Sequence, residues 1–477
     1  MSRRWMALVA AWTVWAAVPA GAQTTWTGPV TFSKDIAPIL QRSCQRCHRP
    51  DSVAPMSLIT YEQARPYARA MKQRTQLKYA PYMRGVMPPW YLETNIGIQK
   101  MKDDVSLSDD EVAKIAKWAD DGAPEGNRAD LPPPLNLVDQ AMWALGKPDL
   151  IVSSPSFIVP AVASDIGTAV GNTPIGLTED RYLKSVEFKE VSEYINGKPQ
   201  GAGTIGALFV IHHANVGIGK ADDAGDPTAD EDTDAISGDR LPIHEVGRNG
   251  DVFPDEAGKF IPANSALIFD NLHIHASGVP GSERKTRLDV GLRLQPQGYK
   301  AKYQVRGAGF GRSELAVIPG QGNQRIDAYF ITQAPMKLWN YEPHMHSTGV
   351  RMCIEAIYGK VTETLNCAGY DHNWVRNYIY AENHEPLIPR GSIIHAFGWF
   401  ENTTKNSNVL DPRNLSTYGN SSVNNMFIIF NQAITLTDEQ YEEELAKRRE
   451  FLKLTGEDPI GCPDCFRQPR AQRGATQ

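Results

Sequence analysis

Apolar residues in the first part of the chain recur at helical spacing. Ile39 and Leu40 share one face of a helix that we expect Ser33 to cap and that ends near two closely spaced cysteines. A second helix is predicted from Ser108, because Glu111 three residues later completes a capping box ahead of another apolar face. This part of the chain therefore predicts a small all-α unit.

The hydrophobic pattern changes near residue 148. From there to about residue 435, short apolar runs such as 150–152, 206–211 and 265–269 alternate with clusters of turn residues. Such alternation is typical of antiparallel β-sandwich domains. Beyond it, Thr437 and Gln440 predict a capping box that opens a charged helix.

Length and composition are those of a globular protein with several domains. The chain has 477 residues, of which 41% are hydrophobic, and a formal net charge of −6, so we expect two or three domains and no nucleic-acid partner. Residues 1–22 have the features of a secretory signal, with Arg3 and Arg4, an apolar run and small residues at the cleavage site. No later segment is long and apolar enough to span a bilayer. These features predict an exported protein, periplasmic or secreted, with no membrane span in its mature form.

Cys44, Cys47 and His48 form a C-x-x-C-H run, the attachment signature of c-type haem. Two thiols bond to the two vinyl groups of the macrocycle, and the adjacent imidazole reaches the iron as its proximal ligand. A redox-active dithiol would need a thioredoxin-like βαβ context, and half of a zinc site would need a second ligand pair nearby. The sequence shows neither, so we expect one covalently bound c-type haem.

Three methionines compete to be the sixth iron ligand. Met87 stands in a Met-Pro-Pro context similar to the distal loop of small c-type cytochromes, and a thioether opposite histidine suits electron transfer. Met83 and Met56 are alternatives, because methionine fills cores more often than it binds metal. Met87 is the favoured ligand.

Six of the eleven histidines occur in tight pairs at the ends of apolar strands. The pairs are His212 with His213, His273 with His275, and His344 with His346. In a strand, residues i and i+2 share a face and can bind one ion together, whereas adjacent histidines need a distorted strand end to converge. All-imidazole ligation suits copper, zinc, nickel or iron, and a thioether such as that of Met426 would favour Cu(I).

The order His-His, His, His-x-His, Met resembles the copper type II monooxygenases, the family of peptidylglycine α-hydroxylating and dopamine β-monooxygenases. The resemblance covers about residues 148 to 435. It is closer to bacterial members, some of which carry an N-terminal cytochrome-like module. It implies two consecutive, jelly-roll-like β-sandwich domains that face one another across a wet cleft, each with one copper ion.

The resemblance also implies which residues bind the two copper ions. The first copper, which relays an electron, would be bound by His212, His213 and a third histidine. The third ligand is His273 or His275, and the spacing to the following glycine favours His273. The second copper, which activates dioxygen, would be bound by His344, His346 and Met426.

Together these features divide the chain into six parts. They are a signal peptide, a cytochrome c-like domain, a linker, a first copper domain, a second copper domain, and a C-terminal helix with a tail, at residues 1–22, 23–130, 131–147, 148–305, 306–436 and 437–477.

The resemblance implies a monooxygenase that hydroxylates a C–H bond of a small organic substrate with dioxygen. Its electrons would come from a redox protein or an ascorbate-like reductant and pass singly through the haem to the three-histidine copper, then to the methionine-bearing copper. The alternative is a periplasmic electron-transfer or copper-binding protein without oxygenase turnover. A third interpretation is a protein with two β-sandwich domains, in which the histidines are structural or bind a single zinc ion.

The remaining cysteines and histidines suggest structural roles. Cys353 and Cys367 flank a predicted hairpin and can form a cross-strand disulfide. Cys462 and Cys465 are expected to form a local disulfide in the tail. Four histidines have no close partner in the sequence and are expected to be structural, namely His244, His372, His384 and His395.

Overall fold

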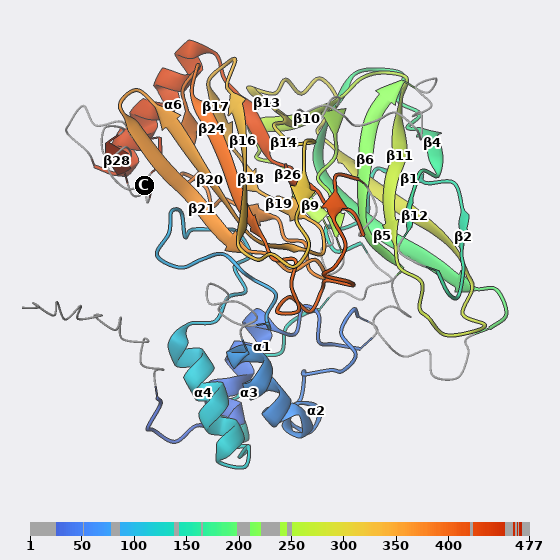
Figure 1. Ribbon diagram of the computed structural model, residues 1–477, viewed down its shortest axis with the longest axis vertical. Helices are drawn as coiled ribbons and strands as arrows, with labels where there is room; N and C mark the ends of the chain where they lie inside the picture. The colour runs from blue at the N-terminus through green and yellow to red at the C-terminus, as the bar shows by residue number, and fades with distance from the viewer. Residues whose placement is uncertain are drawn as a thin grey trace, which may run out of the picture.

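The computed structural model describes residues 25–50, 52–77, 86–137, 143–163, 166–197, 210–220, 239–245, 250–419, 423–453, 461–462, 465 and 467–469. Within these ranges the protein is mostly β-sheet, with a group of short helices near the N-terminus and one helix near the C-terminus (Figure 1). The β-rich architecture expected after residue 148 is confirmed. The expected signal segment, 1–22, lies outside the described residues.

The N-terminal helices pack around one small core, formed by Phe32, Ile36, Leu40, Ile115 and Trp118. In Figure 1 these helices lie together on one side of the sheets. The helical elements are η1 (Phe32–Ile36), α1 (Ala37–Ser43), α2 (Tyr61–Ala64), η2 (Arg65–Tyr67), α3 (Ala68–Gln76), α4 (Asp109–Asp120) and η3 (Arg128–Asp130).

The first helical stretch begins before the residue that the sequence suggested. Thr31 is the N-cap residue of η1, and Ser33 lies inside this element with its hydroxyl donating to the carbonyl of Glu125 at 2.9 Å. Ser33 therefore fastens the helix to the chain that follows α4, and its expected role as a cap is wrong. The capping box of Ser108 and Glu111 is confirmed as the start of α4.

The first β core lies between a six-stranded sheet and half of a ten-stranded sheet. Leu183 and Leu288 from the larger sheet meet Val216 and Leu267 from the smaller one, and none of the four is accessible to solvent. The smaller sheet contains β3 (Ile166–Thr168), β4 (Gly171–Pro174), β6 (Ile211–Lys220), β7 (Asp239–Arg240), β8 (His244–Glu245) and β11 (Ser265–Ile274). This half of the larger sheet contains β1 (Leu150–Ser153), β2 (Phe157–Val159), β5 (Arg181–Tyr194), β9 (Gly250–Val252), β10 (Ala257–Ile261) and β12 (Arg284–Leu294).

The second β core is bounded by the other half of the large sheet and by smaller sheets. Continuing the large sheet are β13 (Tyr303–Gly307), β17 (Met336–Leu338), β23 (Leu387–Ile388) and β27 (Gln432–Thr435). A five-stranded sheet has β16 (Gln324–Ile331), β20 (Gly349–Tyr358), β21 (Val361–Gly369), β24 (Ile393–Phe400) and β28 (Arg467–Pro469). The short sheets have β14 (Phe310–Gly311), β19 (Pro343–Met345) and β26 (Phe427–Ile429), then β15 (Ala316–Val317) with β25 (Ser416–Thr417), and β18 (Asn340–Tyr341) with β22 (Tyr378–Ile379).

One strand belongs to both halves. β13 pairs in parallel with β10 of the first half and antiparallel with β27 of the second, and the other strand pairs in the described ranges are antiparallel. The expected border at residue 305 therefore falls inside a shared strand. Hydrogen bonds across β13 hold the two halves together as parts of one continuous sheet.

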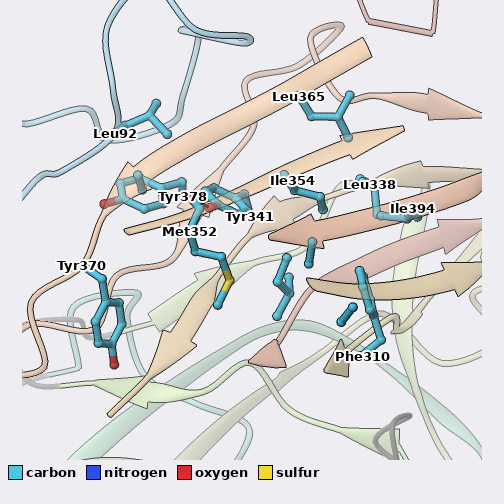
Figure 2. Close-up of a cluster of buried hydrophobic side chains, with 14 of the residues drawn as sticks. Leu92, Phe310, Leu338, Tyr341, Met352, Ile354, Leu365, Tyr370, Tyr378 and Ile394 are labelled. Carbon is cyan, nitrogen blue, oxygen red and sulfur yellow. Dashed lines mark hydrogen bonds between the residues drawn. The ribbon is translucent and has the colours of Figure 1, made fainter. Parts of the chain in front are cut away.

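The second β core also includes residues that precede α4. Trp90, Leu92, Ile98 and Met101 are buried in it, and Figure 2 shows Leu92 with other members of this cluster. Backbone bonds join this segment to the sheet, including Ile98 N to the carbonyl of Leu365 at 2.9 Å. By its packing, segment 90–102 is part of the second β half, although the sequence placed it within 23–130.

The C-terminal helix α6 (Asp438–Phe451) starts at the expected capping box of Thr437 and Gln440, which is confirmed. It packs on the outside of the second half (Figure 1). None of the helices in the described ranges has the length and apolar content of a membrane span.

A charged network fastens α6 to the large sheet. The carboxylate of Glu444 accepts from Lys337 Nζ at 2.7 Å, from Lys447 Nζ at 2.8 Å and from the Tyr303 hydroxyl at 3.0 Å. Burial raises the pKa of Glu444, but the hydrogen bonds from Lys337 and Lys447 outweigh burial and lower it to about 2. The ionised carboxylate therefore stabilises the folded state.

We expect Glu444→Gln to lower the free energy of unfolding by about 2 kcal/mol at pH 7. The folded-state pKa lies below the ordinary value of 4.5, so this stabilisation is complete above pH 4.5 and is lost as the pH falls towards 2. Urea unfolding at pH 7 and pH 3 measures the difference. Glu443→Gln is the matched control, because Glu443 is mostly exposed and meets Lys302 at 3.3 Å. An equal loss at both pH values would contradict the assignment.

Candidate metal centre and cysteine cavity

The first histidine pair lies at a β-bulge. β6 and β11 pair with His213 opposite His273, but the next pair joins Ile211 to Ile274, so His212 is an extra residue on β6. A bulge of this kind places two residues of one strand opposite one of its partner and redirects their side chains. The distorted strand end that adjacent histidines require is therefore present.

The bulge brings the first histidines into one group. The ring centroid of His273 lies 5.4 Å from that of His212 and 4.7 Å from that of His213. His275 stacks on His212 at 4.6 Å and lies 4.9 Å from His273. His273 contacts both members of the adjacent pair, and His275 contacts His212 and His273, so the choice between them as third ligand stays open.

The second set is built on β19 and β26. The rings of His344, on β19, and His346, which directly follows β19, lie 5.4 Å apart. Met345 pairs with Phe427 at the end of this antiparallel pairing, so His346 and Met426 are the residues that directly flank the last pair. Met426 is buried, and its expected role as a ligand stays a prediction.

The two sets lie against each other. The ring centroids of His213 and His344 are 5.2 Å apart. The resemblance implies a wet cleft between two separate sites, whereas here histidines from the two β halves form one buried group. We call this group the histidine cluster, and it consists of His212, His213, His273, His275, His344, His346 and His372.

His372 is the member of the cluster that sequence reasoning missed. Its ring lies 5.8 Å from that of His212, 5.9 Å from that of His273 and 5.7 Å from that of His346. The expectation that His372 is structural, like other isolated histidines, does not fit this position between the two sets. An isolated histidine on a loop gives no spacing signal, so the sequence offered no sign of this contact.

Backbone carbonyls orient two of the imidazoles. His212 Nε2 lies 3.2 Å from the carbonyl of Asn373, and His346 Nδ1 lies 3.3 Å from the carbonyl of Asn424. Metal-binding histidines usually donate the proton of the nitrogen that is not bound to metal to such an acceptor. In such an arrangement Nδ1 of His212 and Nε2 of His346 would be the nitrogens that face a metal ion.

Burial favours the neutral imidazoles that metals require. It holds the pKa of His213, His344 and His372 well below the ordinary value, and the charges of neighbouring histidines lower it further. A neutral imidazole has a lone pair for a metal ion, whereas a protonated one does not.

The donor set of the cluster fits a metal centre, although the rings are not yet arranged around one point. Two imidazoles that bind one ion through nitrogens about 2.0 Å away have ring centroids roughly 5 Å apart. His212 Nδ1 and His213 Nδ1 are 3.2 Å apart, a separation that allows both to bind one ion. Among the described residues, however, no three histidine, cysteine, aspartate or glutamate side chains already converge as a metal ion would require. Metal binding would therefore need rotations of the rings.

The C-x-x-C-H run forms a helical turn beyond α1. His48 N donates to the carbonyl of Cys44 at 2.9 Å and Cys47 N to the same oxygen at 3.1 Å. Residues three and four apart share one helical face, so the two thiols and the imidazole face one side. Neither cysteine is in a disulfide.

These side chains line a largely apolar cavity, which we call the cysteine cavity. It has about 1070 Å³ of space, part of it open to solvent, and its other lining residues include Leu40, Val53, Leu58 and Met71. Burial raises the pKa of the Cys44 thiol to about 12 and also raises that of Cys47. Burial also lowers the pKa of His48, although the backbone of Met56 opposes this. Protonated thiols in an apolar cavity do not fit a reactive redox dithiol, whose thiol pKa is low.

The cavity fits a haem. Met87 and Met56 both line it with His48, so both can supply a sixth ligand, and Met83 lies outside the described residues. Trp374 and Arg376 from the second β half complete the wall. Arg376 Nε is buried and has no hydrogen-bond partner in the described part of the chain, and a haem propionate is an anion that would satisfy it.

A second, smaller cavity, which we call the interface cavity, lies where the two β halves meet. It has about 390 Å³ of space, part of it open to solvent, and Phe430 in its wall is 5.1 Å from the ring of His344. Buried polar atoms of its lining that have no hydrogen-bond partner among the described residues include Asn215 Oδ1, Asn431 Nδ2 and Gln432 Oε1. The cavity can therefore take a small polar molecule close to the second set.

The other isolated histidines lie outside the cluster. His395 Nδ1 and Nε2 each lie 2.7 Å from a carboxylate oxygen, of Glu355 and of Asp327, which agrees with a structural role. His244 packs on Phe188, and His384 packs on Phe451.

Both expected cysteine pairs are disulfides in the structure. One joins Cys353 to Cys367 across β20 and β21, where the two residues face each other in the register. The other joins Cys462 to Cys465.

Comparisons with known proteins leave the family of this chain open. No protein-family model matches it, and no curated protein matches it. The major capsid protein P2 of bacteriophage PM2 is 8% identical, with 60% of this chain and 99% of that chain covered, at a TM-score of 0.25. The top component of cowpea mosaic virus is 10% identical, with 63% and 93% covered, at a TM-score of 0.23. Likeness at these TM-scores carries no argument about this chain.

A buried carboxylate fixes the chain that enters the bulge. Glu190 on β5 accepts from Val210 N at 2.9 Å and from Ile211 N at 2.8 Å. These donors immediately precede His212, so Glu190 sets where the bulge begins. Burial raises the pKa of Glu190, against the effect of these hydrogen bonds.

We expect Glu190→Ala to destabilise the protein by about 2 kcal/mol, because it leaves two buried amide groups without their acceptor. Thermal unfolding measures the loss. Glu193→Ala on the same strand is the control, since Glu193 is exposed, and should have little effect. Equal unfolding temperatures for the two variants would show that Glu190 does not anchor the bulge.

Proposed function

We propose that the chain is an exported copper-dependent monooxygenase with one c-type haem, similar to the copper type II monooxygenases. The observation that carries the proposal is the histidine cluster, in which the expected ligand sets from two β halves lie side by side. All six histidines that occur as pairs in the sequence lie in the histidine cluster. The cysteine cavity supports the haem.

Each part of the chain has a definite role in this proposal. The N-terminal helical unit, with Cys44, Cys47 and His48, is a cytochrome c-like domain, and Met87 or Met56 binds the sixth iron position. The two β halves are the two copper domains. His212, His213 and His273 hold one copper, and His344, His346 and Met426 hold the other.

When bound, copper would activate dioxygen and haem would store single electrons. The chain would hold the imidazoles neutral by burial and orient His212 and His346 through the carbonyls of Asn373 and Asn424. A small organic substrate near His344 would have to widen the interface cavity, whose unpaired polar atoms would then bind it. Hydroxylation of one C–H bond consumes one dioxygen and two electrons with two protons, and yields one alcohol and one water. The electrons come from a redox protein or a small reductant.

A second candidate function follows from the closeness of the two sets. His213 and His344 are in contact, and the interface cavity next to His344 is small. A periplasmic electron-transfer or copper-binding protein would need no cleft. Oxygen consumption that produces an oxidised organic product separates the two functions.

We expect the mature protein to contain one covalent haem and two copper ions after copper is offered. His344→Ala should lower the copper content to one and leave the haem in place, because it removes a ligand of the second set. Cys44→Ser with Cys47→Ser should abolish covalent haem. Metal analysis and the visible spectrum of the reduced protein measure both.

His384→Ala is the matched control, since His384 lies outside the cluster and should leave both contents unchanged. Binding of zinc alone, or no copper after loading, would overturn the two-copper proposal. The chain would then be a haem protein fused to a β-sandwich module.

A further inference from the structure

One short loop contacts both candidate sites. Segment 371–376 lies between β21 and β22. His372 at its start belongs to the histidine cluster, while Trp374 and Arg376 at its end line the cysteine cavity. We call this segment the 371–376 loop. The two sites therefore have a common wall.

The loop is held in place by its own polar groups. Asp371 Oδ1 accepts from Asn373 N at 3.0 Å and from Asn408 Nδ2 at 3.1 Å, and the Asp371 carbonyl accepts from Trp374 N at 2.9 Å. Val375 is buried in the second β core. These contacts give Asn373 and Trp374 a defined backbone position between the two sites.

The loop offers a short connection between the sites. Trp374 in the cavity wall is bonded directly to Asn373, whose carbonyl lies 3.2 Å from His212 Nε2. One aromatic side chain, one peptide link and one hydrogen bond therefore join the cavity to an imidazole of the first set. Arg376, two residues further on, offers its buried Nε to the same cavity.

We propose that the 371–376 loop is the route by which electrons pass from the haem to the first copper set. This rests on the proposed function. In each transfer one electron leaves ferrous haem and reduces one cupric ion, so that haem becomes ferric and copper cuprous. No other oxidant is needed, and a one-electron donor reduces the haem again. Trp374 is a positioning residue that couples the haem to His212, and Arg376 binds a haem propionate.

The test is the rate at which prereduced haem is reoxidised by cupric copper in the full chain, without dioxygen, measured by stopped-flow absorption. In the native protein the rate should depend on copper loading. Trp374→Leu should slow the reoxidation of haem about tenfold, and Trp374→Phe, which keeps an aromatic ring, should reoxidise at close to the native rate. Trp399→Leu is the control, because Trp399 lies on β24, outside the cavity wall, and should leave the rate unchanged.

Haem and copper contents are measured first, so that the two proposals fail separately. A chain without haem or copper refutes the proposed function. A chain with both, in which copper does not speed haem reoxidation or Trp374→Leu reoxidises at the native rate, refutes the loop as the route and leaves the oxygenase standing. If Trp374→Leu folds but loses haem, Trp374 is part of the haem wall, and the reduction potential of the Arg376 variants then decides whether the loop reaches the haem.

Arg376 provides a second measurement that does not depend on copper. A cation beside the haem favours its ferrous form, so Arg376→Gln should lower the reduction potential of the haem. Arg376→Lys keeps the positive charge and should have a reduction potential close to the native one. Redox titration of the haem measures this. An unchanged potential in Arg376→Gln would show that the loop does not reach the haem.

Discussion

The pairing of β13 with a strand from each β half fixes the rest of the architecture. Because β10 and β27 flank it in one sheet, the two halves cannot turn independently about residue 305 without breaking backbone hydrogen bonds. The strand ends that bear the histidines are therefore held at a constant separation. A hinge between two separate sandwiches would let the ligand sets part, whereas a shared sheet keeps His213 against His344.

Where a feature depends on neighbouring residues, the sequence was informative. The capping boxes at Ser108 and Thr437 were predicted because the bonds that form them span three residues. The need for a distorted strand at His212 was foreseen, because side chains of adjacent residues in a regular strand point to opposite faces. Ser33 was misassigned because a serine before an apolar run resembles a cap, while its partner is the distant Glu125.

Features that depend on long-range packing could not be predicted. His372 has no histidine near it in the sequence, and its neighbours in the cluster come from strands far along the chain. Leu92 and Ile98 lie in a short stretch without a sustained helical or strand period, so nothing marked them as part of a β core. The close contact between the ligand sets also escaped sequence reasoning, because spacing along a strand does not report how two strands meet.

The insertion of segment 90–102 into the second β core changes how the chain can be divided. The helical unit is interrupted by it, since α3 precedes the segment and α4 follows it. The cysteine-bearing unit is therefore not an independent domain, although the proline-rich stretch after residue 130 resembles a domain boundary. Truncation there would remove Leu92 and Ile98 from the β core and Glu93 from its ion pair with Arg351. The helical unit and the second β half therefore share a segment of chain and are expected to fold together.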